Sequence, residues 1–371
     1  MQTTRRALLG SATALATWGC ASKTTLLATN TAGRSGRAVT RLDANESPYG
    51  PGPAARAALR DAIDNAGRYS DLGDELIAAI AKRHGVTSDH VVVGTGSFAI
   101  LEMVSRMALR DGGSAVLADP TFPGTADCIT ILGRKIARVP VDKRAVHDLD
   151  AMNGAIGEGT RLAYVCNPNN PTGTIAPASD VAAFCTRNAA RTLVMVDEAY
   201  ADYVDDPRYG SMDDLVRRDV PIVVVRSFSK LFGLAGLRVG YALAPPSVIK
   251  NLRKVRPANE RVWVSGVGAS AALASLGDAE FIRTVRQSNA SVRAKFVGDL
   301  ERLGLTVPAS QTNFVFFTPP GKPDAMRVAL ADRGVRISGR DELGGCRVSI
   351  GLPGEMAAAT DAIAAVLQTS R

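Results

Sequence analysis

Short runs of apolar, mostly β-branched residues alternate with longer segments of helical periodicity through most of the chain. The runs predict strands over residues 91–93, 114–118, 135–141, 162–166, 193–196 and 222–225. Each run precedes or follows a segment long enough for a helix. This alternation is typical of a mostly parallel sheet with helices on both faces, so the sequence predicts an α/β fold.

The pattern changes after residue 260. Residues 260–303 show long helical periodicity, which suits a connecting helix. Beyond it we expect strands over 313–318 and 347–350, a helix near 324–333 and a final helix, which together predict a smaller α+β unit. We place the boundary near residue 290. The predicted organisation is a leader and arm over 1–40, a large domain over 41–290 and a small domain over 291–371.

The N-terminal segment resembles a twin-arginine export leader, because Arg5 and Arg6 precede a mildly apolar run. A frayed amphipathic helix is the alternative. The run of about a dozen residues is too short to span a bilayer, so we expect a periplasmic or exported protein without a membrane span once the leader is removed. Cys20 could carry a lipid anchor, although Thr17 and Trp18 fit a lipidation site poorly. Residues 22–41 are rich in small polar residues and predict a flexible arm.

Charge and composition exclude several functions. The formal net charge is +8, but residues 1–40 hold five basic and no acidic residues, which leaves 39 basic against 36 acidic in the rest. A nearly neutral body without clustered Lys or Arg does not predict nucleic-acid binding. The five cysteines form no CxxC pair, so we expect buried free thiols. With only three histidines, which are scattered, we expect no metal site.

Polar clusters follow four of the predicted strands. The first, residues 94–97, is a glycine turn that opens a helix, and the exposed N–H groups of such a turn can hold a phosphate. The second, residues 167–173, places three carboxamides at the carboxyl end of a strand, where open α/β sheets bind ligands. Taken separately, the first could be only a turn and the second only a rigid Asx turn.

The third and fourth clusters carry opposite charges. Asp197 ends an apolar strand, and a buried carboxylate there requires a cationic partner such as a protonated pyridine nitrogen. Lys230 also follows an apolar strand, where desolvation would lower the pKa of its amine and make it nucleophilic. Ser227, Ser229 and Arg238 near it suit a phosphate. Four such clusters at strand ends are hard to explain by structure alone.

The chain resembles the class I/II aminotransferases of fold type I, and within them the histidinol-phosphate aminotransferase group. The resemblance covers about residues 41–369 and includes LDANESP at 42–48, NPNNPTG at 167–173, DEAY at 197–200, SFSKLFGLAGLRVG at 227–240 and GCRVS at 345–349. It implies an aminotransferase that moves an amino group between an amino acid and a 2-oxo acid such as 2-oxoglutarate, with pyridoxal 5′-phosphate as cofactor. It further implies a homodimer.

The resemblance also assigns roles to residues. Lys230 would carry the cofactor as a Schiff base and move the substrate α-proton, with Asp197 and Tyr200 as the other catalytic residues. Cofactor contacts would come from Ser97, the Phe98 amide, Phe122, Asn170, Asp197, Tyr200, Ser227, Ser229, Lys230 and Arg238. Substrate contacts would come from Arg347, which would clamp the α-carboxylate, from Asn45, and from Tyr69, which would reach into the partner subunit's site.

Two positions depart from the family pattern. Phe98 stands where the family usually has an acidic residue, but the contact there is largely through the backbone. Ser338 falls where the family commonly has an arginine that grips the substrate phosphate, and Arg336 or Arg340 would have to replace it. We therefore expect an unphosphorylated, aromatic or otherwise bulky amino acid as the preferred substrate.

Two other functions stay open at this point. A decarboxylase or a racemase could use the same scaffold and cofactor, because the fold does not decide which bond breaks. A non-catalytic ligand-binding protein is the remote alternative, although such regulators usually add a DNA-binding domain and none is visible in the sequence.

Overall fold

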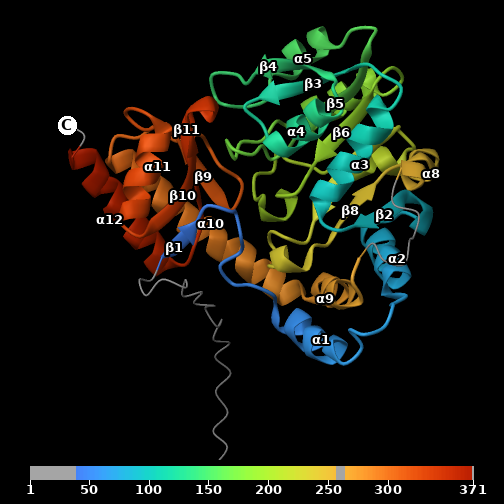
Figure 1. The fold of residues 1–371 in the computed structure, drawn as a ribbon, viewed down its shortest axis with the longest axis horizontal. Helices are drawn as coiled ribbons and strands as arrows, with labels where there is room; N and C mark the ends of the chain where they lie inside the picture. The colour runs from blue at the N-terminus through green and yellow to red at the C-terminus, as the bar shows by residue number, and fades with distance from the viewer. Residues whose placement is uncertain (1–38, 256–263, 370–371) are drawn as a thin grey trace, which may run out of the picture.

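A seven-stranded sheet with the strand order β2-β8-β7-β6-β5-β3-β4 forms the larger part of the molecule (Figure 1). The structure is a computed structural model that describes residues 39–255 and 264–369. The strands are β2 (Val91–Gly94), β3 (Ser114–Asp119), β4 (Lys135–Pro140), β5 (Thr160–Cys166), β6 (Leu193–Asp197), β7 (Ile222–Ser227) and β8 (Gly240–Leu243). The six strands predicted for this region are confirmed, and so is the α/β fold class. Arg5, Arg6 and Cys20 lie outside the described residues.

The sheet is parallel except for β8, which the hydrophobic pattern did not predict. This short strand pairs antiparallel with both β7 and β2. Because it runs in the opposite direction, β8 begins at the edge where β7 ends, and the residues just before it return to that edge. Gly240 at its start packs so closely on the N-terminus of the helix after β2 that a Cβ atom would collide with the Ser97 amide nitrogen.

Helices cover both faces of this sheet, as the alternation of strands and helices predicted. One face packs against α3 (Ser97–Leu109), α4 (Pro123–Ile131) and α8 (Pro246–Val255). The opposite face packs against α1 (Pro53–Ile63), α2 (Leu72–His84), α5 (Leu149–Ala155), α6 (Ala178–Asn188), α7 (Asp213–Arg217), α9 (Gly266–Gly277) and the first half of α10 (Ala279–Arg302). The central strands are therefore buried on both sides, which explains their continuous apolar runs.

A second sheet of four strands has the order β1-β10-β11-β9 and forms the smaller unit. Its strands are β1 (Thr40–Leu42), β9 (Phe314–Phe317), β10 (Val335–Arg340) and β11 (Gly345–Ser349), covered on one face by α11 (Pro323–Asp332) and α12 (Pro353–Thr369). The first strand pairs parallel with β10. Strand β1 thus lies in the sheet of the C-terminal unit, whereas the prediction placed residue 40 in the N-terminal arm and residues 41–42 in the large domain.

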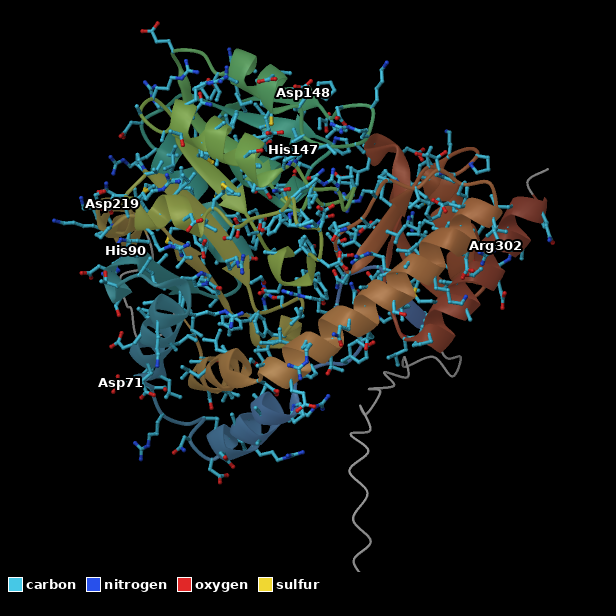
Figure 2. The ribbon with its side chains drawn as sticks, turned by 180° about the vertical axis from the view of Figure 1, so that it is seen from behind. Asp71, His90, His147, Asp148, Asp219 and Arg302 are labelled. Carbon is cyan, nitrogen blue, oxygen red and sulfur yellow. The ribbon has the colours of Figure 1, made fainter. Side chains whose placement is uncertain are left out.

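Helix α10 connects the two units, and residue 290 lies within it. Phe281 and Val285 near its start belong to the core of the large unit, whereas Phe296 and Leu300 belong to the core of the small one. Seen from behind, α10 runs from below the large sheet to Arg302 in the small unit (Figure 2). The helical segment predicted over 260–303 is divided, because Asp278 ends α9 and its carboxylate caps α10 by accepting a hydrogen bond from the Phe281 amide.

Alternation along β10 and β11 separates a core face from an open face in the small sheet. Val335 and Ile337 are buried in the core, so Arg336, Ser338 and Arg340 occupy the opposite face. Ser338 is paired directly with Arg347 of β11, which places both side chains on the same face.

Within residues 39–255 and 264–369, no helix combines the length and apolar character needed to cross a membrane.

Candidate active site

One cavity of about 430 Å³ lies where the carboxyl edge of the large sheet meets the small sheet. Its walls include twelve of the thirteen residues predicted from the sequence to form the site: Asn45, Ser97, Phe98, Phe122, Asn170, Asp197, Tyr200, Ser227, Ser229, Lys230, Arg238 and Arg347. These residues come from segments far apart in the chain, between residues 45 and 347. The strand-end clusters therefore do converge in space.

Hydroxyl groups and a guanidinium gather at one end of this cavity. Gly96 precedes α3 with a φ of 84° and no side-chain cap, so the first-turn N–H groups of α3 stay available. The Arg238 guanidinium packs against Gly96 and donates to Ser229 Oγ at 3.4 Å. The Ser229 amide in turn donates to Ser227 Oγ at 3.1 Å. A helix N-terminus, two hydroxyls and a cation together form a seat for a phosphate group.

A buried carboxylate lies deeper in the cavity, at the end of β6. Asp197 accepts hydrogen bonds from the Tyr164 hydroxyl at 2.9 Å and from the Ala199 amide at 3.1 Å. Burial raises the pKa of the Asp197 carboxyl to about 6, although both donors favour the ionised form. A cationic ligand group beside Asp197 would restore the ordinary ionisation of this carboxylate.

Tyr164 belongs to the site but was not predicted from the sequence. It is fully buried in β5, and its side chain lies on the same face of the sheet as Asp197. A tyrosine within a buried apolar strand requires a hydrogen-bond partner for its hydroxyl, and this requirement was the available signal.

The Lys230 amine lies between the two units. Its Nζ donates to the Ala44 carbonyl oxygen at 3.3 Å and lies 5.6 Å from the centre of the Tyr200 ring. Burial, followed by the positive charge of Arg347, lowers the pKa of Lys230 to about 8. The sequence predicted this direction. An amine with such a pKa is partly neutral near physiological pH and can act as a nucleophile or a base.

A network of hydrogen bonds around Tyr200 joins three other residues that line the cavity. Its hydroxyl accepts from Asn45 Nδ2 at 3.0 Å and from Asn170 Nδ2 at 3.4 Å. Arg347 donates to Asn170 Oδ1 at 2.7 Å and to the Asp43 carbonyl oxygen at 2.8 Å. The Arg347 Nε atom is buried and has no partner in the described part of the chain, and burial lowers the pKa of this guanidinium. Arg347 is thus a buried cation suited to an incoming carboxylate.

Asn45 joins the N-terminal segment to the small sheet. The Asn45 backbone has a positive φ of 53°, and its amide donates to Ser349 Oγ at 2.8 Å. The Ser349 hydroxyl donates to Asn45 Oδ1 at 3.1 Å, and Asn313 Nδ2 donates to the Asn45 carbonyl oxygen at 3.0 Å. Asn313 and Ser349 were not assigned a role from the sequence. They hold Asn45 in a conformation that non-glycine residues rarely adopt.

Two aromatic rings line the same cavity as Asp197 and Lys230. Phe122 and Phe98 meet edge to face with their centroids 6.5 Å apart. The Phe98 side chain is 40% exposed, so the position where the family usually has an acidic residue here carries an apolar ring at the mouth of the cavity.

Tyr69 is the predicted site residue that the structure does not bring to this cavity. It lies between α1 and α2 and is 79% exposed.

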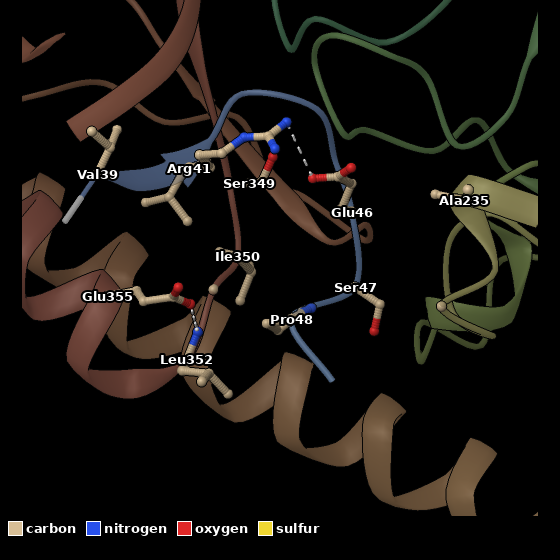
Figure 3. A pocket seen from close by; sticks show the side chains of 14 residues that line it. Val39, Arg41, Glu46, Ser47, Pro48, Ala235, Ser349, Ile350, Leu352 and Glu355 are labelled. Atoms are coloured by element: carbon tan, nitrogen blue, oxygen red, sulfur yellow. Dashed lines mark hydrogen bonds and ion pairs between the residues drawn. The ribbon is translucent and has the colours of Figure 1, made fainter. Parts of the chain in front are cut away.

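A smaller cavity of about 270 Å³ adjoins the main one and shares Glu46, Ala235 and Gly236 with it. Figure 3 shows the Arg41 and Glu46 side chains pointing toward one another at the edge of this cavity, and Glu355 accepting a hydrogen bond from the Leu352 amide. The Arg41 and Glu46 side chains form an ion pair at 3.9 Å. Glu46 therefore places a negative charge at the mouth of the main cavity.

The described cysteines have no part in a disulfide. Cys128, Cys166, Cys185 and Cys346 are free and buried, as predicted for these four. Among the described residues no group of three or more Cys, His, Asp or Glu side chains could hold a metal ion.

Comparison with known proteins identifies relatives over nearly the whole chain. The family model "Aminotransferase class I and II" matches residues 37–363. A histidinol-phosphate aminotransferase of Cupriavidus pinatubonensis is 39% identical over 328 residues, which are 86% of each chain. That of Brevibacillus brevis is 37% identical over 307 residues, 82% of this chain and 83% of the relative. The crystal structure of histidinol-phosphate aminotransferase from Sinorhizobium meliloti in complex with pyridoxal-5′-phosphate has a TM-score of 0.82 at 28% identity, covering 91% of this chain and 93% of that one.

Proposed function

We propose a role for each residue of this pocket in binding the cofactor and the substrate. The premise is that the chain belongs to the class I and II aminotransferases and is a pyridoxal-phosphate-dependent aminotransferase. The residues present fit this cofactor. An anion seat, a buried carboxylate with a raised pKa and a lysine with a lowered pKa line one cavity. These groups match a phosphate, a protonated pyridine nitrogen and an aldehyde.

Each of these groups has its own task, and Lys230 has two: it binds the cofactor's aldehyde and acts as a base. Ser97, Ser227, Ser229 and Arg238 hold the phosphate, and Asp197 holds the ring nitrogen, with Tyr164 orienting its carboxylate. When bound, the cofactor withdraws electrons from the substrate α-carbon and so acidifies its C–H bond. The Lys230 amine is the base that takes this proton and returns it, because its pKa of about 8 lies close to the working pH.

Arg347 holds the substrate α-carboxylate in this scheme. Its guanidinium is already oriented by Asn170 Oδ1 and the Asp43 carbonyl oxygen, and Nε is free of any partner in the described residues. Two parallel hydrogen bonds to a carboxylate fix the orientation as well as the position of the substrate. Asn45 and Tyr200 bound the same end of the cavity.

The proposed amino donor is an unphosphorylated, aromatic or otherwise bulky amino acid, and 2-oxoglutarate is the proposed acceptor. The observation that carries this choice is Ser338, an uncharged residue that is paired with Arg347 on the same face of the sheet. Ser338 lines a separate cavity together with Arg336 and Arg340, and in the proposal this neighbouring space meets the second substrate group. Arg336 is engaged with Asp43 Oδ2 at 3.0 Å, and this ion pair reduces its availability for a phosphate. Because these relatives are named histidinol-phosphate aminotransferases, histidinol phosphate is the competing candidate for the amino donor.

A donor screen tests this proposal. The specificity constant kcat/KM is measured for phenylalanine, tyrosine, histidine and histidinol phosphate with 2-oxoglutarate, in the wild type and in Ser338→Arg. Loss of a charge-assisted contact changes selectivity by tens to thousands of fold, so Ser338→Arg should shift preference toward histidinol phosphate by about 30-fold or more. A wild type that already favours histidinol phosphate by about a hundredfold contradicts the proposal. Release of CO₂ without keto-acid exchange would favour a decarboxylase instead.

A homodimer with Tyr69 reaching the partner's site is also proposed. Tyr69 is 79% exposed and Ile63, six residues before it, is 64% exposed, so both side chains are accessible to a partner subunit. Mixing two inactive variants, Tyr69→Ala and Lys230→Ala, tests it: hybrid dimers would regain up to one wild-type site, and no recovery from mixed subunits counts against it.

Export by the twin-arginine route is proposed from residues 1–20 alone. Cell fractionation of the native chain beside an Arg5→Lys, Arg6→Lys variant tests it. Periplasmic recovery should be lost in the variant, and equal recovery of both refutes the route.

A further inference from the structure

A buried ion pair lies directly behind the proposed cofactor site, on the other face of the large sheet. Glu198 follows Asp197 at the end of β6, and Arg226 precedes Ser227 at the end of β7. Val224, two residues before Arg226, belongs to the core on one face of the sheet, and Val225, two residues before Ser227, belongs to the core on the other, so Arg226 and Ser227 point to opposite faces. Neither Glu198 nor Arg226 lines the cavity.

The contacts of this pair join the two strand ends. Arg226 Nη1 donates to Glu198 Oε2 at 2.7 Å, and the two side chains are 9% and 1% exposed. The Glu198 carboxylate also accepts from Ser211 Oγ at 2.6 Å and from the Met212 amide at 2.7 Å. The Glu198 amide donates to the Val225 carbonyl oxygen at 2.8 Å. Both the backbone and the charges therefore fix β6 to β7 at this level.

The pair continues into a wider polar layer. Tyr241 of β8 stands opposite Arg226 in the ladder, and its hydroxyl lies 2.9 Å from His84 Nε2. The other ring nitrogen of His84 lies 2.9 Å from Asp213 Oδ2. Burying charges in this way is expensive, and well-packed apolar residues of similar volume are often as stable as a buried ion pair. Stability alone thus gives no reason for Glu198 and Arg226 to be charged.

The cofactor supplies such a reason, because it is a rigid ligand held at two ends. We propose that Glu198 and Arg226 are positioning residues that fix the separation between the Asp197 carboxylate and the phosphate seat at Ser227 and Ser229. This inference rests on the proposed roles of Asp197 and of the two serines. A misplacement of about 1 Å between groups that act together can cost about a hundredfold, so locking adjacent strand ends preserves binding at both.

The test compares ligands that use one end of the site with a ligand that uses both. Dissociation constants are measured for pyridoxal 5′-phosphate, pyridoxal and inorganic phosphate with cofactor-free protein, for the wild type and the double variant Glu198→Gln, Arg226→Met. The Glu198→Gln change keeps one oxygen to accept from the Met212 amide, and its NH2 group can donate to the Ser211 hydroxyl. In the double variant neither position carries a charge. The advantage of pyridoxal phosphate over pyridoxal, which is the ratio of their dissociation constants, should fall about tenfold or more in the variant. The affinity for inorganic phosphate should stay within about threefold of the wild-type value.

A matched control separates positioning from general loss of structure. Arg293 of α10 is a buried arginine away from the cavity, with Nη1 donating to the Thr312 carbonyl oxygen at 2.9 Å and Nη2 3.7 Å from Asp205 Oδ2. Arg293→Met should lower the Tm of the protein and leave the advantage of the phosphorylated ligand unchanged. Arg226→Lys keeps the charge and should retain part of that advantage; it replaces the double variant if the latter does not fold.

The outcomes distinguish the inference from the roles on which it rests. A wild type that shows no advantage for pyridoxal phosphate over pyridoxal overturns the phosphate seat itself. A wild type with this advantage and a folded variant within about threefold of it overturns the positioning role. An equal loss in Arg293→Met also overturns it, because the effect would then follow from stability.

Discussion

The two sheets contribute to the cavity in different ways. In the large sheet, the site residues Ser97, Asp197 and Ser227 stand at strand ends or helix starts, so the buried strands fix their positions through the backbone. In the small sheet, Arg347 reaches the cavity from the middle of β11, and its position depends on hydrogen bonds to Asn170 of the large unit and to the Asp43 carbonyl oxygen, just after β1.

This difference indicates that the fold sets the positions of the cofactor contacts, whereas a few side chains set the substrate preference. The carboxyl edge of a parallel sheet brings strand ends together whatever their neighbours are, and this edge holds the proposed cofactor contacts. On the open face of the small sheet, a single substitution changes the charge that a substrate meets, and Ser338 beside Arg347 is such a place. Substitutions in the large sheet should therefore abolish the chemistry, and those in the small sheet should change substrate use.

The largest effect is expected for Lys230→Ala. Loss of the amine removes both the covalent attachment of the cofactor and the base for the α-proton, so kcat should fall about 10⁴-fold or more. The visible absorbance of the holoenzyme should change with it. A variant that keeps the wild-type spectrum would place the attachment at another lysine.

A smaller but still large effect is expected for Asp197→Ala. The pyridine nitrogen would lose its counter-charge, and kcat should fall by about 10³-fold while part of the cofactor stays bound through its phosphate. Steady-state kinetics with cofactor occupancy measured by absorbance checks this. Tyr164→Phe serves as the milder companion, because it removes one donor to Asp197 and keeps the carboxylate. Near-wild-type turnover in Asp197→Ala contradicts its assignment.

Arg347→Gln probes the small sheet and should act mainly on KM. Loss of a charge-assisted contact to the α-carboxylate is worth about 2 to 5 kcal/mol, which lowers kcat/KM by about 30-fold or more. The absorbance of the bound cofactor should change little. If the spectrum were lost while KM stayed constant, the division of labour between the two sheets would be wrong.

The smallest effect concerns the pH dependence of cofactor loading. Only the neutral amine of Lys230 can attack the aldehyde, so the loading rate should rise with pH up to the pKa of about 8 and then level off. Because the positive charge of Arg347 helps to lower this pKa, Arg347→Gln should move the inflection to higher pH. Stopped-flow absorbance measures both profiles. An inflection near 10, as for an exposed lysine, would show that Lys230 is not desolvated.

Much of the large sheet and its site could be predicted because local sequence and position coincide there. An apolar run followed by Asp197 or Lys230 is visible in the chain, and the parallel arrangement brings such strand ends together. Strand β8 was missed, since four residues that begin with a glycine give too short a pattern. Its reversed direction, which returns Arg238 to the phosphate seat, depends on tertiary pairing.

Contacts between distant segments could not be predicted from the sequence, for a different reason. The Tyr164 hydroxyl meets Asp197, and Ser349 and Asn313 hold Asn45, only after the strands are in register. The Glu198–Arg226 pair faces the opposite side of the sheet from Asp197 and Ser227. A pattern of polar strand ends alone therefore does not show which residues contact the cofactor and which ones position those residues from behind. Alternation along β10 places Arg336 and Ser338 on one face, which a period-two pattern alone indicates.

The central claim is that the cofactor is attached to Lys230 within this cavity. Reducing the holoenzyme with borohydride converts the bond between cofactor and lysine into a stable amine, and peptide mass spectrometry then locates it. We predict a single phosphopyridoxyl modification on the peptide containing Lys230, absent from Lys230→Ala. A modification of another lysine in the wild type, or none at full cofactor occupancy, would contradict the account.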